Sequence, residues 1–466
     1  MKNYVSNIIG EEYKKWGKED GVFIDCQTGQ GKTYFILNIY AQYLFDNNKR
    51  MLILTNRSKL FEEVNKSRVT SNVDVMTYQR FQDQIENNEI IKRYDCIVCD
   101  ECHYFISDAW NYKTDIAWRY IKELDSIKIF MSATGDIAFK LFSFEKAYRY
   151  FVDRDYDYID KIYFYEDDKY VSKILKAVPE DEKAIYFANS VKKAHNKYLE
   201  FKDESSFICS KGQDEIYTRD ITTNAIVNAK FATKYLIATK VIDNGINLKD
   251  KAIKHIICDI KDIVTVLQCI GRRRIDADDK EDKITLYIKN YTRSELNRFK
   301  NSLVKEIKSA DAYMLNLNEY KLNREEKKIP SLCYINKITG QIEVLILYYT
   351  LARTQLKEID EMMKIGYDKV LLKELIVDPN RICYVKQIEV QHKANDIEEY
   401  LGNIVGKKLG KQEKEDLAKK IDARDDRNRY QKNIAKLNEY LVSNNSKYEI
   451  LAKRSNGNNL WIVMLK

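Results

Sequence analysis

Proline and long apolar runs are scarce in this chain. Only three prolines occur among its 466 residues, and it contains no stretch of about 18 apolar residues, the length that a membrane-spanning helix needs. The first residues, MKNYVSNIIGEEYKKW, also lack the apolar segment of a signal peptide. We therefore expect a soluble, cytoplasmic protein without a membrane partner.

A strong excess of one charge sign is also missing. The net charge is +8 although 32% of the residues are charged, which permits a polyanionic partner without requiring one. Hydrophobic residues make up 44% of the chain, and its length predicts two to four domains. The few prolines beside 34 tyrosines are typical of an AT-rich coding sequence, so composition alone names no substrate.

The cysteines give no sign of a disulfide framework. They number nine, an odd count, and are scattered through predicted strands, as expected of reduced thiols in a cytosol. Cys96, Cys99 and Cys102 have the spacing of iron–sulfur ligands. No fourth ligand is near in sequence, and the first two fall in a predicted buried strand, so we expect these thiols to pack in a core.

Short β-rich segments alternate with helical patterns through the first 295 residues. Continuous apolar strands separated by helices predict parallel sheets covered on both faces. The expected fold class is α/β, with one parallel-sheet domain at 1–153 and a second at 154–295. The strands are expected to start near residues 21, 51, 73, 94 and 127, and then, after a polar segment at 153–161, near 161, 183, 205, 235, 253 and 283.

The alternation ends after residue 295. Segments 295–317 and 346–367 have helical periodicity, and between them lies a hairpin that turns at Thr339-Gly340. We assign residues 296–399 to a helical accessory region. Residues 400–466 predict a helix, a connector, a helix and a hairpin, an order that suggests a small winged-helix-like module.

The segment CQTGQGKT, which begins at Cys26, joins an apolar strand pattern to a helical one. Gly29 and Gly31 permit a tight turn that directs backbone N–H groups at phosphate oxygens, and the following helix adds its positive end. Lys32 would reach the β- and γ-phosphates, and Thr33 would bind Mg²⁺. Cys26 is a departure, since a glycine is usual there. We expect ATP and Mg²⁺ to bind here.

Two carboxylates, Asp100 and Glu101, end the predicted strand that starts near residue 94. The C-terminal edge of a parallel strand is where a magnesium nucleotide needs a carboxylate. Asp100 would hold the metal through water, and Glu101 would polarise the attacking water. A solvated surface pair is the alternative, and it is weakened because the pair ends a buried strand.

Five ordered motifs resemble those of superfamily 2 helicases of the DExH type. The resemblance covers roughly residues 15–290 and implies two RecA-like domains that sandwich ATP, with single-stranded nucleic acid crossing both. The motifs are TGQGKT at 28–33, DECH at 100–103, SAT at 132–134, IATKVIDNGINL at 237–248 and QCIGRRR at 268–274.

The same resemblance implies roles for single residues in the second, third and fourth of these motifs, which the family numbers II, III and V. His103, Ser132 and Thr134 would couple the nucleotide site to movement between the domains. Asp243 and Gly245 would lie near the nucleotide.

The last motif departs from the family pattern. Gln268 would contact the nucleotide side, and Arg272 would act as an arginine finger that stabilises transition-state charge. The family usually has its second arginine three residues after the first, where this chain has Ile275. Arg274 is the substitute and Arg273 the second choice. From the residues alone, this arginine cluster could equally bind a phosphate backbone.

Adenine and nucleic-acid contacts are less specific in sequence. Upstream of the phosphate loop, Trp16 is the candidate for stacking on the base, although an aromatic at helical spacing also suits a core. The candidate contacts to the nucleic-acid backbone in the two sheet domains are Asn56, Arg57, Thr77 and Thr239. For the loop residues among them, solvated surface positions are an equal alternative.

A basic stretch near the C-terminus is a further candidate contact. Between residues 407 and 436 there are eleven Lys or Arg and six Asp or Glu. Arg424, Arg427 and Arg429 would meet phosphates, and a helix at 430–444 would read the nucleic acid. The alternative is a solvated helical face with a packing hairpin.

These features together predict an ATP-dependent DNA helicase or translocase that acts in replication, recombination or repair, with DNA favoured over RNA and replication proteins as partners. The compact size and the AT-rich composition are similar to helicases of phages and mobile elements. Two alternatives stay open: a nucleotide-switched DNA–protein remodeller or loader that separates no strands, and an RNA helicase.

Overall fold

The computed structural model describes most of the chain, which forms two compact units, Met1–Ile382 and Cys383–Lys466. No helix among the described residues is both long and apolar enough to cross a membrane. These residues are 4–27, 29–55, 70–89, 91–133, 139, 142, 144–152, 154, 156–210, 215–239, 247–276, 279–315, 329–336, 340–424, 429–444, 446–455 and 458–466.

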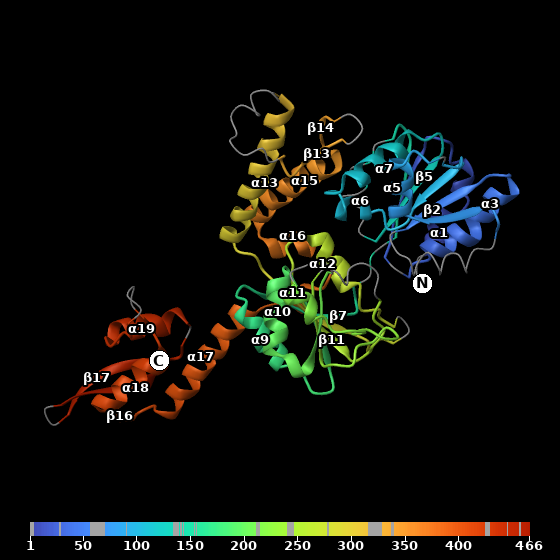
Figure 1. Ribbon diagram of the computed structural model, residues 1–466. Coiled ribbons are helices and arrows are strands. Elements are labelled where there is room, and N and C mark those ends of the chain that lie inside the picture. The colour runs from blue at the N-terminus through green and yellow to red at the C-terminus, as the bar shows by residue number, and fades with distance from the viewer. Residues whose placement is uncertain are drawn as a thin grey trace. The chain divides into compact units, whose positions relative to one another are not determined.

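The first unit begins with a sheet of parallel strands in the order β3-β2-β4-β5-β1-β6 (Figure 1). Strands β1, β2, β4 and β5 are buried at every residue, as expected of apolar strands covered on both faces. The strands are β1 (Gly21–Asp25), β2 (Met51–Thr55), β3 (Val73–Thr77), β4 (Cys96–Cys99), β5 (Ile127–Ser132) and β6 (Ala147–Phe151).

The sequence did not predict β6. This strand lies at the sheet edge, and its sequence, AYRYF, leaves Ala147, Arg149 and Phe151 exposed. An edge strand needs cover on fewer sides than a central one, so it carries a weaker apolar signal. The remaining five strands of the sheet lie where the sequence predicted them.

Helices supply a core to each face of this sheet. Because side chains alternate along a strand, Val22 and Ile24 of β1 pack with Phe35 on one face, whereas Phe23 packs with Phe105 on the other. The helices of this domain are α1 (Val5–Ile9), η1 (Glu12–Lys15), α2 (Lys32–Tyr34), η2 (Phe35–Tyr40), α3 (Ala41–Asp46), α5 (Tyr78–Glu86), α6 (Tyr104–Ser107) and α7 (Tyr112–Glu123).

A second sheet follows, in the order β15-β7-β12-β11-β8-β10-β9, and its pairs among β7 to β12 are parallel. The predicted pair of RecA-like, parallel-sheet domains is thereby confirmed. The strands are β7 (Ile159–Tyr165), β8 (Lys183–Ala188), β9 (Ser205–Ile208), β10 (Tyr235–Ala238), β11 (Ile253–Asp259), β12 (Ile284–Lys289) and β15 (Ile382–Tyr384), and the helices are α9 (Lys169–Lys176), α10 (Val191–Glu200), η3 (Lys202–Glu204), α11 (Glu215–Arg219) and α12 (Ile263–Ile270).

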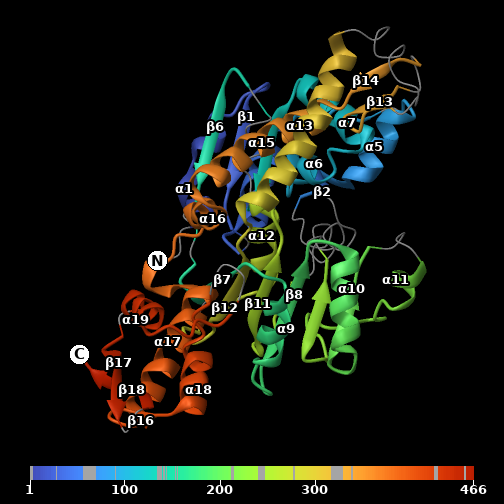
Figure 2. The same cartoon turned by 90° about the vertical axis from the view of Figure 1, so that its left-hand side faces the viewer.

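An accessory region of helices and one short hairpin completes the first unit. Figure 2 shows α13 and α15 side by side, and they share a core that includes Ile307, Ala310 and Ala352. The predicted turn at Thr339 lies outside the described residues. The elements are α13 (Arg293–Leu315), the antiparallel strands β13 (Cys333–Ile335) and β14 (Ile342–Val344), α15 (Ile346–Ile365), α16 (Tyr367–Glu374) and η5 (Pro379–Arg381).

The accessory helices contact both sheet domains. At the start of α15, Leu347 and Leu351 pack in a core of the first domain, and the backbone amide of Leu347 donates to the buried Asp115 carboxylate (2.9 Å). At the start of α16, the buried Tyr367 hydroxyl donates to the carbonyl of Ile260, in the second domain (2.8 Å). The segment from α15 to α16 is therefore anchored at two different domains.

The second unit has its own apolar core. We expected this unit to begin at residue 400, but it begins earlier, at Cys383. Helix α17 contributes Ile397 and Leu401 to the same core as Leu437 and Val463. Its antiparallel sheet has the order β16-β18-β17. The elements are α17 (Val385–Asn403), β16 (Lys408–Leu409), α18 (Lys411–Ile421), α19 (Ile434–Ser443), β17 (Tyr448–Ser455) and β18 (Asn458–Leu465).

Removing the Asp115 side chain should loosen the start of α15. Asp115→Ala leaves the buried amide of Leu347 without its acceptor, which should lower the free energy of unfolding by about 1–3 kcal/mol. Asp115→Asn keeps an oxygen in place and should lose less. Unfolding in denaturant, followed by circular dichroism, compares the two variants. Asp115 also forms an ion pair with Arg119 (2.7 Å). An equal loss in both variants would show that this ion pair, and not the oxygen that accepts from Leu347, supplies the stability.

Candidate nucleotide site

The predicted phosphate loop leaves the C-terminal end of β1 and leads into α2. Gly29 and Gly31 have φ angles of +90° and +85°, which residues with a side chain rarely adopt. The loop is fixed at its start because the amide of Cys26 donates to the carbonyl of Ser132 (3.2 Å). Cys26, which replaces the usual glycine, is fully buried. The loop therefore has the backbone that a phosphate cradle requires, with a thiol packed beneath it.

Lys32 is buried inside this loop. Its ammonium group donates to the carbonyl of Cys26 (2.7 Å). Burial acts to lower the pKa of Lys32, but Coulomb interactions with Cys26, Glu101, Asp100 and Asp25 raise it on balance. The lysine is therefore held in its charged form. The carbonyl oxygen that it now contacts could be replaced by a phosphate oxygen, which carries more negative charge.

Asp100 and Glu101 follow β4 and interact electrostatically with Lys32. Asp100 is buried, and its backbone is fixed at both ends, since its amide donates to Leu54 (2.9 Å) and its carbonyl accepts from Tyr78 (3.1 Å). Glu101 has a φ of +51°, a conformation that is uncommon outside glycine and that clusters at functional sites. Both predicted carboxylates thus lie in the electrostatic surroundings of the phosphate loop.

His103 joins this carboxylate pair to the next strand. Its Nδ1 lies 3.1 Å from the Ser132 hydroxyl and 3.3 Å from the Glu101 carboxylate. Ser132 ends β5, where it is in register with Asp25 of β1. The structure therefore brings two of the three predicted coupling residues into contact, whereas Thr134 lies outside the described residues.

The donor set fits a nucleotide-bound Mg²⁺. Among the described residues, no group of three or more His, Cys, Asp and Glu is gathered for a metal. Mg²⁺ at nucleotide sites takes only one or two protein oxygens, with phosphates and waters as its other ligands. The hydroxyl of Thr33, which is exposed, and the carboxylate of Asp100 are oxygens of this kind.

The three clustered cysteines do not share a site. Cys96 belongs to the core on one face of the first sheet, and Cys99 and Cys102 to the core on the other face. Burial raises the pKa of all three thiols, which favours neutral packing groups over metal-binding thiolates.

The last two motifs meet through their backbones. Leu248, from the end of the predicted motif V, donates to the carbonyl of Arg272 (2.8 Å) and accepts from the amide of Arg274 (2.7 Å). The Arg274 guanidinium also donates to Asn247 (2.6 Å). This pairing fixes the arginine segment against motif V.

The three neighbouring arginines have different surroundings. Arg273 forms an ion pair with Asp282, and both side chains are almost completely buried. Arg273 is thus committed to the interior of the second domain, and the role of substitute arginine stays a prediction for Arg274. Arg272 and Gln268 are largely buried as well.

Of the other three residues predicted in motif V, the structure describes Thr239. Thr239 follows β10, is largely buried, and donates its amide to Ile208 (3.3 Å). Asp243 and Gly245 lie outside the described residues.

Trp16, the candidate for stacking on the base, lies in the core, which is the alternative that the sequence left open. It is 5% exposed, and its indole nitrogen donates to the Tyr150 hydroxyl (3.2 Å). Its ring packs among aromatic rings that include Phe35 and Tyr40. The large side chain of Trp16, which suggested stacking on a base, instead fills the apolar core beneath η2.

Tyr4 is an aromatic neighbour of the loop that the sequence reading missed. A Cβ at Gly31 would lie 3.4 Å from the Tyr4 ring, which is 42% exposed. The chain is held there because the amide of Val5 donates to the carbonyl of Gln30 (3.0 Å). No spacing rule signals this contact, because the N-terminal segment reaches the loop through tertiary structure.

Of the three nucleic-acid contacts predicted in the first domain, the structure describes Thr77. Asn56 and Arg57 lie outside the described residues. Thr77 ends β3, and its hydroxyl oxygen accepts from the amide of Arg80 (3.2 Å), so that it caps α5. This capping explains the residue's local role and leaves its contact with nucleic acid a prediction.

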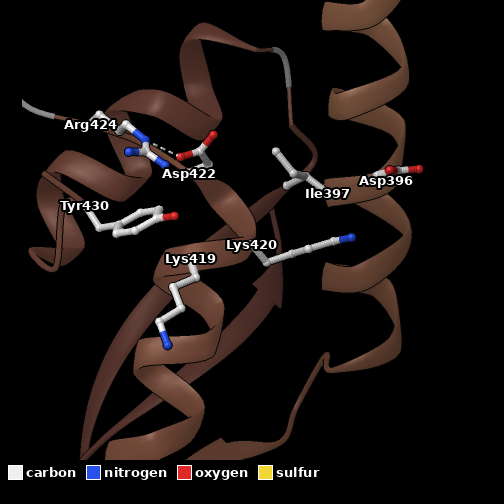
Figure 3. Close-up of a pocket in the computed structure, with 7 residues that line it drawn as sticks. All are labelled: Asp396, Ile397, Lys419, Lys420, Asp422, Arg424 and Tyr430. Carbon is white, nitrogen blue, oxygen red and sulfur yellow. Dashed lines mark hydrogen bonds and ion pairs between the residues drawn. The ribbon is translucent and has the colours of Figure 1, made fainter. Parts of the chain in front are cut away.

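In the second unit, Arg424 stacks on Tyr430 (4.2 Å from the ring centroid) and pairs with Asp422 (2.5 Å). Arg429 is exposed, and Arg427 lies outside the described residues. An open cavity of about 300 Å³ lies beside this stack, and Figure 3 shows the side chains that line it. It is lined by Asp396, Ile397, Lys419, Lys420, Asp422, Arg424 and Tyr430.

Two family models match the chain, one on each sheet domain. Residues 58–136 match "Type III restriction enzyme, res subunit", and residues 167–275 match "Helicase conserved C-terminal domain". The curated proteins include no match.

Solved structures also resemble the chain, at low identity. One is "S. cerevisiae Dbp5 bound to RNA and ADP BeF3", with 16% identity, a TM-score of 0.44, and 75% of this chain and 89% of that chain covered. Another is Mss116p bound to ssRNA and AMP-PNP, with 14% identity, a TM-score of 0.43, and 78% and 90% covered. At such TM-scores these likenesses carry no argument. The two family matches lie on the two parallel-sheet domains, and the model that matches the second of them is a helicase domain.

Proposed function

We propose that the protein is an ATP-driven nucleic-acid motor of the DExH type, which unwinds or translocates along DNA. The observation that carries this proposal is the convergence at one edge of the first sheet. There Lys32 lies in the field of Asp100 and Glu101, and Glu101 in turn lies beside His103. Lys32 follows β1, whereas Asp100, Glu101 and His103 follow β4, and parallel strands bring their carboxyl ends to one edge.

In the proposed reaction, Lys32 turns from the Cys26 carbonyl to the β- and γ-phosphates, while the N–H groups of the loop hold their oxygens. Glu101 orients and polarises the attacking water. A bound Mg²⁺, held through Thr33 and Asp100, would neutralise charge on the phosphate oxygens.

Groups of the second domain complete the proposed site. Arg272 and Arg274 stabilise the charge that develops in the transition state, and Gln268 contacts the nucleotide. Asp243 and Gly245 lie near the nucleotide in this proposal. Closure of the domains on ATP and their release after hydrolysis would move the nucleic-acid strand.

The contact of His103 with Ser132 supports its coupling role. A change at Glu101 during hydrolysis is passed to His103 and from there to the end of β5, which borders β1. Thr134 would continue this path, and Asn56, Arg57, Thr77 and Thr239 would hold the nucleic-acid backbone.

The second unit supports DNA as the track. Its order of helix, strand, two helices and a two-stranded hairpin, with the sheet order β16-β18-β17, is that of a winged helix. We therefore assign α19 as the reading helix and β17–β18 as the wing, with Arg424, Arg427 and Arg429 on phosphates. A phage or mobile-element origin and replication partners belong to the same proposal and rest on composition.

Glu101→Gln should bind ATP with nearly parental affinity but hydrolyse it at least about 100-fold more slowly, because it loses the group that polarises water. Steady-state hydrolysis and binding of a fluorescent nucleotide measure the two properties separately. Lys32→Ala, which should lose productive binding, is the blank. Parental turnover in Glu101→Gln would refute its assignment.

The nucleic-acid track can be identified by hydrolysis assays with single-stranded DNA, duplex DNA or single-stranded RNA. DNA should raise the parental turnover number most, and a duplex with an overhang should be unwound. Stimulation without unwinding would instead indicate a remodeller, and preference for RNA would indicate an RNA helicase.

Removing residues 385–466 should weaken DNA binding by about tenfold or more while leaving basal hydrolysis, because a contact set with several phosphates is lost. The cut falls after β15, which belongs to the second sheet, so that this sheet keeps all its strands. DNA affinity can be measured by fluorescence anisotropy at two salt concentrations. An unchanged affinity would assign the second unit to another role.

Tyr4 replaces Trp16 in the proposal as the aromatic that stacks on the base. Tyr4→Ala should raise the KM for ATP by about 3- to 10-fold, the range expected of one aromatic contact. Trp16→Phe is the matched control, since it should lower the midpoint of thermal unfolding without raising KM. An unchanged KM in Tyr4→Ala would remove Tyr4 from the site.

A further inference from the structure

The segment that joins the two sheet domains lies against the phosphate loop. From this segment, the Arg154 guanidinium donates to both carboxylate oxygens of Asp25 (3.3 and 3.0 Å) and to the carboxylate of Glu374 (3.1 Å). The Asp25 side chain is 2% exposed and that of Arg154 is 14% exposed. One arginine therefore bridges residues that are far apart in the sequence, in a largely desolvated setting.

The segment touches the loop at neighbouring points as well. The amide of Val152 donates to the carbonyl of Asp25 (2.9 Å). The side chain of Tyr156, which is buried, interacts with that of Gln27. The joining segment thus follows the chain from the end of β1 into the phosphate loop.

Asp25 occupies a sensitive position in that loop. It is the last residue of β1 and precedes Cys26, whose carbonyl accepts from Lys32. Its carboxylate also acts electrostatically on Lys32. Without a partner, the buried Asp25 carboxylate would attract Lys32 and repel the phosphates of a nucleotide. Arg154 balances this negative charge, so that Lys32 stays available to bind phosphate.

Glu374 connects the same arginine to the accessory helices. It ends α16, and the segment from α15 to α16 is anchored to the first domain through Asp115 and to the second through Tyr367. A displacement of these helices changes the position of Glu374 and thereby the hold of Arg154 on Asp25.

We propose that Arg154 is a positioning residue of the nucleotide site, which acts through Asp25 on the phosphate loop and through Glu374 on the accessory helices. The inference rests on the proposed ATP hydrolysis and adds a path by which the accessory region influences it. A role in stability alone would explain this ion pair less well, because the cost of desolvating two buried charges offsets most of their attraction.

The test is a double-mutant cycle on Arg154 and Asp25. Arg154→Gln should raise the KM for ATP by about tenfold, because the Asp25 charge is left near the phosphates. Asp25→Asn combined with Arg154→Gln removes that charge and should restore KM to within about threefold of the parent. Arg154→Lys, which keeps the charge, should fall between these two variants. Thermal unfolding of each variant identifies any loss of fold.

The path through Glu374 is tested with a neighbouring carboxylate as control. Glu374→Gln should reduce the stimulation of hydrolysis by nucleic acid, measured as the ratio of the stimulated to the basal rate, by about threefold or more. Glu361→Gln removes an exposed carboxylate of α15 that pairs with Lys373, and should leave both rates unchanged.

The outcomes separate this inference from the proposed function. If the parent hydrolyses ATP and Lys32→Ala does not, the function stands, and additive KM effects in the cycle would overturn the positioning role alone. An effect of Glu361→Gln equal to that of Glu374→Gln would overturn the path to the accessory helices. A parent without hydrolysis would overturn the function and this inference together.

Discussion

The balance of charge around the buried Lys32 is the constraint on which the rest of the site depends. A buried ammonium group needs compensation, and Asp25, Asp100 and Glu101 supply it from two neighbouring regions of one sheet edge. Asp25 requires its own counter-charge, which Arg154 provides. The phosphate loop is therefore a network that extends to the segment between the domains. Its fixed carbonyl acceptor and its carboxylates keep the lysine charged and within reach of a phosphate.

Local patterns predicted the sheets because a central parallel strand is apolar at every residue and needs no knowledge of its partners. Strands β1, β2, β4 and β5 carry this signal, whereas the edge strand β6 exposes every second residue and was missed. The phosphate loop and the carboxylate pair were predictable for a similar reason, since each joins one strand to the element after it. Sequence alone could also anticipate that Asp100 and Lys32 lie near enough to interact electrostatically, because carboxyl ends of parallel strands share an edge.

Contacts that depend on tertiary structure were not predictable. Trp16 and Tyr4 are both aromatic and both precede the loop, but the docking of α1 and η1 leaves Tyr4 exposed at Gly31 and buries Trp16 against Tyr150. The arginine cluster behaves likewise. Arg273 and Arg274 are adjacent in sequence, and the first is held in the interior by Asp282 and by the carbonyl of Ile253. Residue type limits what a side chain can do, and packing then selects one of the options.

The polar segment near residue 153 illustrates how a correct boundary can conceal a function. Its composition predicted a connector between domains, and the chain does pass there from the first sheet to the second. A segment that only joined two domains would not need side chains that contact buried polar groups. Arg154 and Tyr156 instead contact Asp25 and Gln27, and these polar side chains fit because the surface they meet is the charged end of the phosphate loop. Polarity at this point of the chain thus reflects the neighbouring nucleotide site as well as exposure to solvent.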